Sequence, residues 1–251
     1  MNCDQRFTFI DICAGIGGFS LGLEMAGMTC AGQVEIDEYC NRVLEKHWPA
    51  VPRWRDVKEI NPADLPAVEL ICGGYPCQPF SLSGERRGQE DDRHLWPFIF
   101  SIIAQKKPAW CLFENVVGHV TLGLDQVLSD LESLGYATWP LIIPACAVGA
   151  LHQRDRIWIM ANAPGFRFIC DNSKIKAGVD YQNSERRSPK EADLFFDFRG
   201  GGNVSDSFDV RTFYEFPYGM DRVKSCGNAI VWKIPYELGR AILLAHGREE
   251  K

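Results

Sequence analysis

The sequence predicts an α/β fold with a mostly parallel central sheet and helices on both faces. The chain has 251 residues, of which 46% are hydrophobic and 24% charged, enough for one sizeable core. In residues 1–162, short and nearly all-apolar runs alternate with amphipathic segments. Strands that are apolar on both faces are typical of a parallel sheet covered by helices on both sides.

Individual elements follow from local pattern. Runs rich in β-branched and aromatic residues predict strands at 7–12, 29–36, 68–72, 110–115 and 156–161. Apolar residues at helical spacing predict helices at 19–27, 38–48, 95–106, 125–134 and 228–246.

The composition changes along the chain and divides it into three regions. Residues 1–162 form the expected main domain. Residues 163–224 are rich in Gly, Ser, Asn and Asp and show weak periodicity, which predicts a short irregular lobe. Residues 225–251 recover helical spacing, and we expect them to pack back on the main domain.

Charge, cysteines and hydropathy narrow the class of protein. No signal-peptide pattern or membrane-spanning apolar run is seen, so a cytoplasmic protein with no membrane partner is expected. The ten cysteines are scattered singly, without zinc-like spacing, which predicts neither a disulfide framework nor a metal. The net charge of −6 excludes a broad basic surface, so nucleic acid would be contacted by local basic clusters.

Cys77 stands in an unusual loop, "ICGGYPCQPFSLSG" at 71–84. Pro76 and Pro79 interrupt regular structure on either side of it, and two glycines before them permit sharp turns. Such a loop is stiff and presents one side chain. We therefore interpret Cys77 as a nucleophile rather than a core cysteine.

A strand, a Gly-rich turn and a helix make up "DICAGIGGFSLGLEMAG" at 11–27. The turn carries G-x-G-G, and Ser20 replaces the third glycine of a dinucleotide fingerprint. Glu35, at the end of the next strand, can accept from ribose hydroxyls. The pattern favours S-adenosylmethionine over NAD, with a tight packing turn as the alternative.

Three charged residues stand at the ends of two apolar strands. Glu114 ends one of them in "FEN", where desolvation would raise the pKa of its carboxyl and let it hold or donate a proton. Arg154 and Arg156 lie on one side of the extended segment "HQRDRIWIM". Their guanidinium groups suit a carboxylate, phosphate or carbonyl oxygen, and a surface ion-pair ladder is the alternative.

In this order, the Gly-rich turn, Pro-Cys, Glu-Asn, Arg-x-Arg and a late "GNAI" resemble the cytosine-C5 DNA methyltransferases. The resemblance covers roughly residues 7–162 and 222–246, and "PCQPFSLSG" is its most specific part. It implies a Rossmann-like methyltransferase fold in which residues 163–224 form a short target-recognition region. It also implies transfer of a methyl group to C5 of a flipped-out cytosine.

The resemblance assigns the catalytic roles. Cys77 would attack C6 of cytosine, and Glu114 would contact N3 and the exocyclic amine. Arg156 would hold the base carbonyl O2, and Arg154 would orient the site. Four side chains of the loop after Cys77 would contact double-stranded DNA: Ser81, Ser83, Arg86 and Arg87.

The resemblance also implies a set of S-adenosylmethionine contacts and no metal. The backbone of 14–18 would approach the cofactor, Glu35 the ribose and Asp56 the adenine amino group. The full expected set is Cys13, Ala14, Gly15, Ile16, Gly17, Gly18, Glu35, Ile36, Asp56, Val57, Pro76, Leu95, Asn228 and Ala229. Cys13 stands where many relatives carry an aromatic residue, and Ile36 stands where some carry Trp.

Several alternatives stay open at the level of sequence. One alternative is a tRNA cytosine methyltransferase, which would share this core. Two alternatives belong to other functional classes: a catalytically idle DNA-recognition protein and an NAD-dependent oxidoreductase. A monomer is expected, with a protein partner as an option because the recognition region is short. The sequence predicts neither the DNA site that is recognised nor the biological context, for which restriction-modification and phage self-protection are two options.

Overall fold

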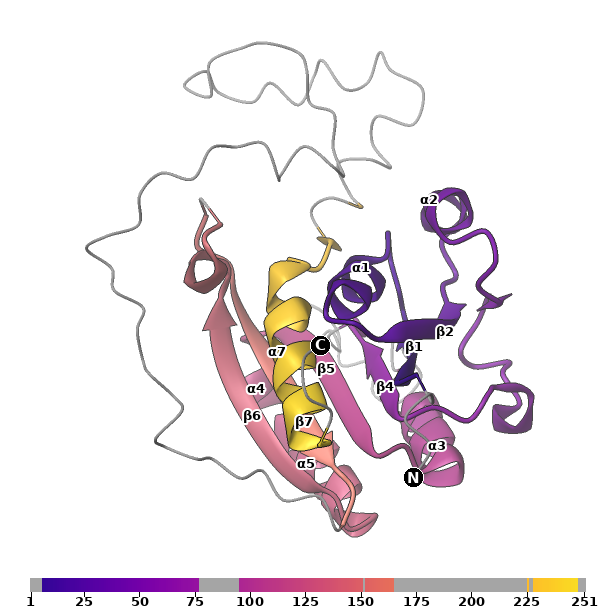
Figure 1. The fold of residues 1–251 in the computed structure, drawn as a ribbon. Helices are drawn as coiled ribbons and strands as arrows, with labels where there is room; N and C mark the ends of the chain where they lie inside the picture. The colour runs from indigo at the N-terminus through magenta and orange to yellow at the C-terminus, as the bar shows by residue number, and fades with distance from the viewer. Residues whose placement is uncertain (1–5, 77–94, 151, 165–224, 226–227, 248–251) are drawn as a thin grey trace, which may run out of the picture. The chain divides into compact units, whose positions relative to one another are not determined.

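The computed structural model describes residues 6–76, 95–150, 152–164, 225 and 228–247. Within these residues seven strands form one sheet in the order β3-β2-β1-β4-β5-β7-β6 (Figure 1). The strands are β1 (Thr8–Ile12), β2 (Thr29–Val34), β3 (Arg53–Trp54), β4 (Leu70–Gly73), β5 (Trp110–Val116), β6 (Ala137–Pro144) and β7 (Asp155–Asn162). All neighbours pair in parallel except β7, which is antiparallel to β5 and β6. The predicted fold class is confirmed.

Helices lie on both faces of the sheet. α1 and α7 lie on one face, and α3 and α5 lie on the other (Figure 1). The helices are α1 (Gly18–Met25), α2 (Glu38–His47), α3 (Trp96–Lys106), α4 (His119–Leu122), α5 (Leu124–Ser133) and α7 (Lys233–Ala245), with 3-10 turns η1 (Pro62–Asp64) and η2 (Ala145–Val148).

The larger apolar core lies between the sheet and helices α3 and α5. Ile12, Ile71 and Phe113 of the parallel strands are fully buried there against Ile99 of α3 and Leu131 of α5. These side chains alternate along each strand with others that face α1 and α7. A strand buried on both faces must be apolar throughout, which explains the near-continuous apolar runs.

Helix α7 packs on α1 through small residues. A Cβ added at Gly22 would lie 2.3 Å from the carbonyl oxygen of Trp232, and one added at Gly239 would lie 3.0 Å from Leu23. Only glycine allows the two helices to approach this closely. The C-terminal segment therefore belongs to the same packed unit as the Gly-rich turn.

Several features of the fold differ from the expected elements, among them the short strand β3 and the short helix α4, neither of which was expected. β6 was not expected, because Pro140 and Pro144 lie within it. β6 is the edge strand next to β7, where a proline removes no central ladder bond, so the strand tolerates both. The last helix begins at Lys233 instead of residue 228, and residues 229–231 are irregular.

The boundaries of the three regions predicted from composition, 1–162, 163–224 and 225–251, stay a prediction. Backbone contacts group residues 1–167 with 221–251 in one compact unit. The proposed recognition region, 163–224, lies outside the described residues apart from 163 and 164. None of the described helices is both long and apolar enough to cross a membrane.

Candidate active site

The Gly-rich turn leaves the carboxyl end of β1 with a left-handed backbone. Cys13, Gly15 and Gly17 have φ values of 59°, 56° and 89°. The turn is tied to β2 by the Ala14 N–H, which donates to the Val34 carbonyl at 3.0 Å. A Cβ at Gly17 would lie 2.5 Å from the ring of Trp48, so this position requires glycine.

Glu35 holds this turn from the end of β2. Its carboxylate accepts from the Gly15 N–H at 2.7 Å and from the Asp37 N–H at 2.8 Å. Asn41 donates its side-chain amide to the Glu35 carbonyl at 2.6 Å. Glu35, which is 8% exposed, thus fixes both the turn and the start of α2. The sequence predicts a ribose contact for Glu35, and in the structure its carboxylate accepts from two backbone N–H groups.

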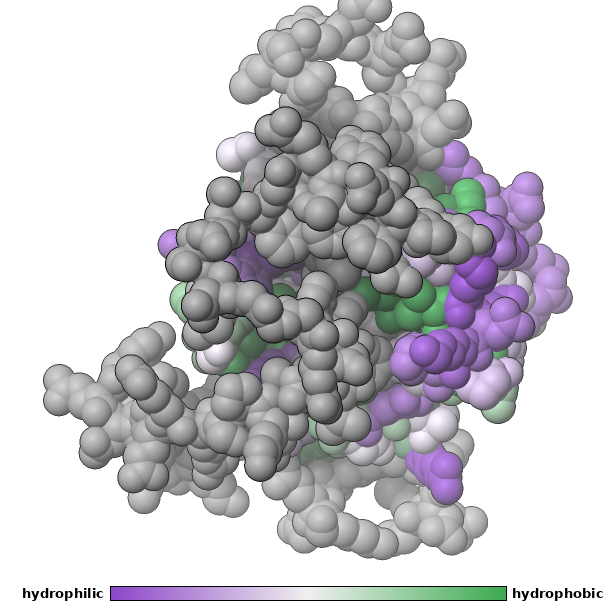
Figure 2. All heavy atoms as spheres, turned by 90° about the horizontal axis from the view of Figure 1, so that it is seen from above, coloured by the Kyte–Doolittle hydropathy of each residue, from purple (hydrophilic) through white to green (hydrophobic). Residues whose placement is uncertain are grey.

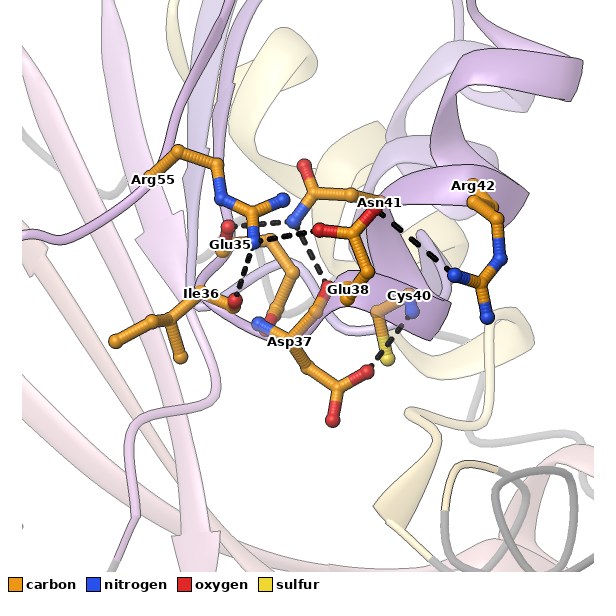
Figure 3. A network of polar contacts seen from close by, with 8 residues as sticks. All are labelled: Glu35, Ile36, Asp37, Glu38, Cys40, Asn41, Arg42 and Arg55. Carbon is orange, nitrogen blue, oxygen red and sulfur yellow. Dashed lines mark hydrogen bonds and ion pairs between the residues drawn. The ribbon is translucent and has the colours of Figure 1, made fainter. Parts of the chain in front are cut away.

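The loop after β2 presents an apolar side chain above a polar network (Figure 3). Ile36 is 62% exposed, and its side chain points away from the polar contacts. Its carbonyl accepts from Arg55 at 3.0 Å, and the same Arg55 nitrogen lies 2.9 Å from Glu38. Asp37 caps α2 by accepting from the Cys40 N–H at 3.0 Å. The backbone around Ile36 is therefore fixed by the hydrogen bond from Arg55 and by the Asp37 cap of α2.

The residues expected near an adenosine group follow the ends of β1, β2, β3 and β4, apart from Leu95, which precedes α3. Val57 is buried in the apolar core, and Cys13 and Leu95 pack against that core. Asp56 accepts from the Lys58 N–H at 2.9 Å. Pro76 is exposed.

These residues fit a nucleoside cofactor. A Cβ added at Gly15 would meet no atom within 4 Å, so the left-handed turn borders open space. The exposed Ile36 offers an apolar contact beside it. Seen from above, hydrophobic surface is flanked by hydrophilic side chains on the described part of the molecule (Figure 2).

A second cluster forms where β5 meets β7. The Glu114 Oε1 atom lies 3.0 Å from Nε of Arg156, and the two side chains are 11% and 24% exposed. Arg156 also donates to the Asp155 carbonyl at 2.9 Å, which fixes its guanidinium group. The structure thus joins two residues that the sequence placed on separate strands.

Burial and charge set the protonation of this cluster. Burial raises the pKa of Glu114 to about 7, against the lowering effect of Arg156 and then of Arg154. Burial and the neighbouring Arg156 lower the pKa of Arg154, whereas Glu114 raises it. The desolvated strand-end carboxyl expected from the sequence is therefore present. Near neutral pH such a group can hold or release a proton.

Ile230 connects the two clusters. A Cβ added at Gly18 would lie 2.7 Å from its Cβ and from its carbonyl oxygen. A Cβ added at Gly74 would lie 3.2 Å from Cδ1 of Ile230 and 3.4 Å from Oε2 of Glu114. The segment that holds the expected Asn228 and Ala229 therefore reaches the Gly-rich turn and the carboxyl group together, with Asn228 exposed and Ala229 partly buried.

Sequence reasoning missed the polar support beneath the turn. Asp11 is fully buried and accepts from the backbone N–H and hydroxyl of Ser20, at 3.1 and 2.8 Å. Gln33 donates to the same hydroxyl at 3.0 Å. An aspartate inside an otherwise apolar strand was the available signal. Ile230 ends the "GNAI" motif, but its contacts with the turn could not be foreseen, and Trp48 had no signal because apolar side chains look alike in core and site.

Some expected site residues lie outside the described residues. These are Cys77, Ser81, Ser83, Arg86 and Arg87. Among the described cysteines, burial raises the pKa of Cys30 to about 12 and that of Cys40 to about 11. Burial also raises the pKa of Cys13, Cys72 and Cys111 well above the usual range. These five thiols are poor nucleophiles, since a thiol attacks as thiolate.

Comparison with known proteins identifies the family. The model of the C-5 cytosine-specific DNA methylases matches residues 7–207. The chain belongs to this family. It is 32% identical over 194 residues to the type II methyltransferase M.HgiCII of Herpetosiphon aurantiacus, covering 73% of this chain and 42% of that protein. It is 33% identical over 178 residues to M.HhaI of Haemophilus parahaemolyticus, covering 66% and 54%.

Solved structures share the fold of this chain. A DNMT2 variant from Spodoptera frugiperda matches with a TM-score of 0.56 and 21% identity, over 64% of this chain and 51% of that one. A prophage-encoded putative DNA modification methyltransferase from E. coli matches with a TM-score of 0.53 and 24% identity, over 63% and 47%. The chain spans about half the length of these proteins, or less.

Proposed function

We propose that the protein transfers a methyl group from S-adenosylmethionine to C5 of a cytosine in double-stranded DNA. The observation that carries the proposal is the buried Glu114 carboxyl, with a pKa of about 7, paired with Arg156 beside the segment that reaches the Gly-rich turn. DNA is the substrate we favour because the family model that matches the chain is that of the C-5 cytosine-specific DNA methylases.

The chain's own residues divide the work of binding the cofactor. The backbone of 13–18 and Glu35 would hold the sugar and methionine parts, and Ile36 with Asp56 and Val57 would contact the adenine. When bound, S-adenosylmethionine supplies the methyl group as a carbon attached to a positively charged sulfur. The open space at Gly15 and the exposed Ile36 support this assignment.

The reaction at the base would begin with Cys77. Its thiolate forms a bond to C6 of the extruded cytosine, which moves electrons toward C5. Glu114 would share its proton with N3 while Arg156 contacts O2, so that the negative charge is stabilised as it develops. After C5 is methylated, loss of the C5 proton restores the ring double bond and breaks the bond between Cys77 and C6.

The test is transfer of labelled methyl to unmethylated duplex DNA and, in parallel, to tRNA, with Cys77→Ala as the control. Bisulfite sequencing would map the product in DNA. We expect label in DNA that disappears with Cys77→Ala. Label in tRNA alone would move the substrate to RNA, and retention of label by Cys77→Ala would overturn the covalent mechanism.

The cofactor assignment has a separate test that needs no nucleic acid. Because a ligand that binds only the folded state raises the melting temperature, S-adenosylhomocysteine should stabilise the protein and NAD should not. Stabilisation by NAD alone would contradict the assignment.

A further inference from the structure

Two consecutive residues after β4 face two consecutive residues of β5 on opposite sides of the sheet. A Cβ added at Gly74 would lie 3.4 Å from Oε2 of Glu114 and 3.2 Å from Cδ1 of Ile230, on the face of α1 and α7. Tyr75 lies on the other face, where its carbonyl accepts from the side-chain amide of Asn115 at 3.2 Å. Because side chains alternate along a strand, the two contacts together hold both faces of the junction between β4 and β5.

Tyr75 is anchored a second time, through its side chain. Its hydroxyl lies 2.9 Å from Nε2 of His119, the first residue of α4. Both side chains are buried, with exposed fractions of 5% and 3%. The Tyr75 ring also packs against Trp96 and Phe113, with ring centroids 5.5 and 6.0 Å away. The His119 ring packs closely on Gly123, since a Cβ added at Gly123 would lie 3.0 Å from Cε1 of His119.

Tyr75 and His119 lie where a small displacement would move the chain that leaves β4. Tyr75 stands between Gly74, whose position leaves room for only a hydrogen beside Ile230 and Glu114, and Pro76, which precedes Cys77 in the sequence. Asn115 follows Glu114 directly and donates to Tyr75, while its own side-chain oxygen accepts from the Val116 N–H at 2.9 Å. A shift of the Tyr75 side chain would therefore change the path of the chain toward Cys77 relative to Glu114.

We infer that the buried Tyr75–His119 hydrogen bond is a positioning device that sets the exit of the chain from β4 relative to Glu114. Neither residue has a catalytic role in the proposed reaction, and both would act through the backbone of 74–76 and through Asn115. The inference rests on the proposed function for its catalytic consequence. A misplacement of about 1 Å at a reacting group can cost about a hundredfold in rate, so a modest loosening is measurable.

The test compares Tyr75→Phe with a matched control, Tyr136→Phe. Tyr136 is a buried tyrosine whose hydroxyl donates to the Pro108 carbonyl at 2.6 Å, near the amino end of β5 and away from Glu114. Each variant removes one buried hydroxyl. His119→Leu removes the other partner, and His119→Gln keeps a polar atom close to the position of Nε2.

The first readout is the kinetics of methyl transfer to duplex DNA. We expect Tyr75→Phe and His119→Leu to lower kcat by about tenfold, with KM for DNA and cofactor within about twofold. Tyr136→Phe should keep kcat, and His119→Gln should recover part of it. The double variant Tyr75→Phe/His119→Leu should be no slower than the slower single variant, because both remove one interaction.

The second readout is amide hydrogen exchange, which does not depend on activity. Exchange in peptides covering 70–76 and 112–119 should accelerate in Tyr75→Phe and stay unchanged in Tyr136→Phe. Unchanged exchange, a kcat within about twofold of the wild type, or an equal loss in both tyrosine variants would overturn the inference. A wild-type protein that methylates neither DNA nor tRNA would instead overturn the proposed function, and exchange would still decide whether the pair holds the junction.

Discussion

The Oε1 atom of Glu114 lies 3.0 Å from Nε of Arg156, across the antiparallel pair of β5 and β7. In the strand register Arg156 is opposite Val116, so it meets Glu114 along the diagonal of one sheet face. Burial favours the neutral carboxyl, and the guanidinium group favours the carboxylate. The pKa of about 7 is the balance of these two opposing effects, and each can be altered by itself.

Replacing Arg156 should shift the pH dependence of the reaction. Arg156→Gln removes the group that most lowers the pKa of Glu114, so this pKa should rise above about 7. If the protonated carboxyl is the active form, the loss of rate on the alkaline side should move to higher pH while the maximal rate falls. Single-turnover rates across the pH range measure this. Arg240→Gln, in an exposed ion pair on α7, should leave the profile in place.

The stability of the folded protein should also depend on the protonation of Glu114. Its pKa is raised from 4.5 to about 7, so its contribution is fully present below about pH 4.5 and is lost as the pH rises through about 7. The shift corresponds to a loss on the order of 3 kcal/mol in the free energy of unfolding.

Glu114→Gln tests this linkage directly. Urea unfolding from about pH 5 to about pH 8 should show a smaller decline for the variant than for the wild type. Glu59→Gln, an exposed carboxylate near η1, should keep the wild-type slope. A variant that declines as steeply as the wild type would show that Glu114 does not carry the effect. Asp11, whose pKa burial also raises to about 7, contributes with the same sign.

Glu35 should matter both for stability and for cofactor binding. Its carboxylate accepts the N–H groups of Gly15 and Asp37, and Glu35→Ala leaves both donors without this partner. We expect a loss of about 2 to 3 kcal/mol in the free energy of unfolding and weaker binding of S-adenosylhomocysteine. Denaturant titration and calorimetry measure the two effects. Glu38→Ala, which breaks only exposed ion pairs, should cost less than about 1 kcal/mol.

A single methyl group added at Gly18 should push the Gly-rich turn and the segment 229–231 apart. Gly18→Ala would place a Cβ 2.7 Å from the carbonyl oxygen of Ile230 and force the 229–231 segment outward. Binding of S-adenosylhomocysteine should fall by about tenfold or more, with a clear drop in melting temperature. Gly118→Ala, whose Cβ would meet no atom within 4 Å, should bind as the wild type does. Equal affinity in the two variants would contradict this role for Ile230.

The sequence by itself determined the features that are local and periodic. Alternating apolar and amphipathic segments predicted a mostly parallel sheet, because strands buried on both faces must be apolar throughout. The glycines at 15 and 17 indicated a sharp turn after β1, and their positive φ values agree with it. The position of Glu114 at the end of an apolar strand predicted a desolvated carboxyl, since the strand end in such a sheet is shielded from water.

Only the tertiary structure decided which of these residues meet. The pairing of Glu114 with Arg156 depends on β7 lying antiparallel to β5, and the contacts of Ile230 depend on α7 packing on α1. The bond between Tyr75 and His119 requires α4 to begin directly behind the end of β4. Edge strand β6 was not predicted, because the prolines in its sequence argue against a strand. Periodicity reports which face of an element is apolar, whereas strand order and helix packing join residues that are distant along the chain.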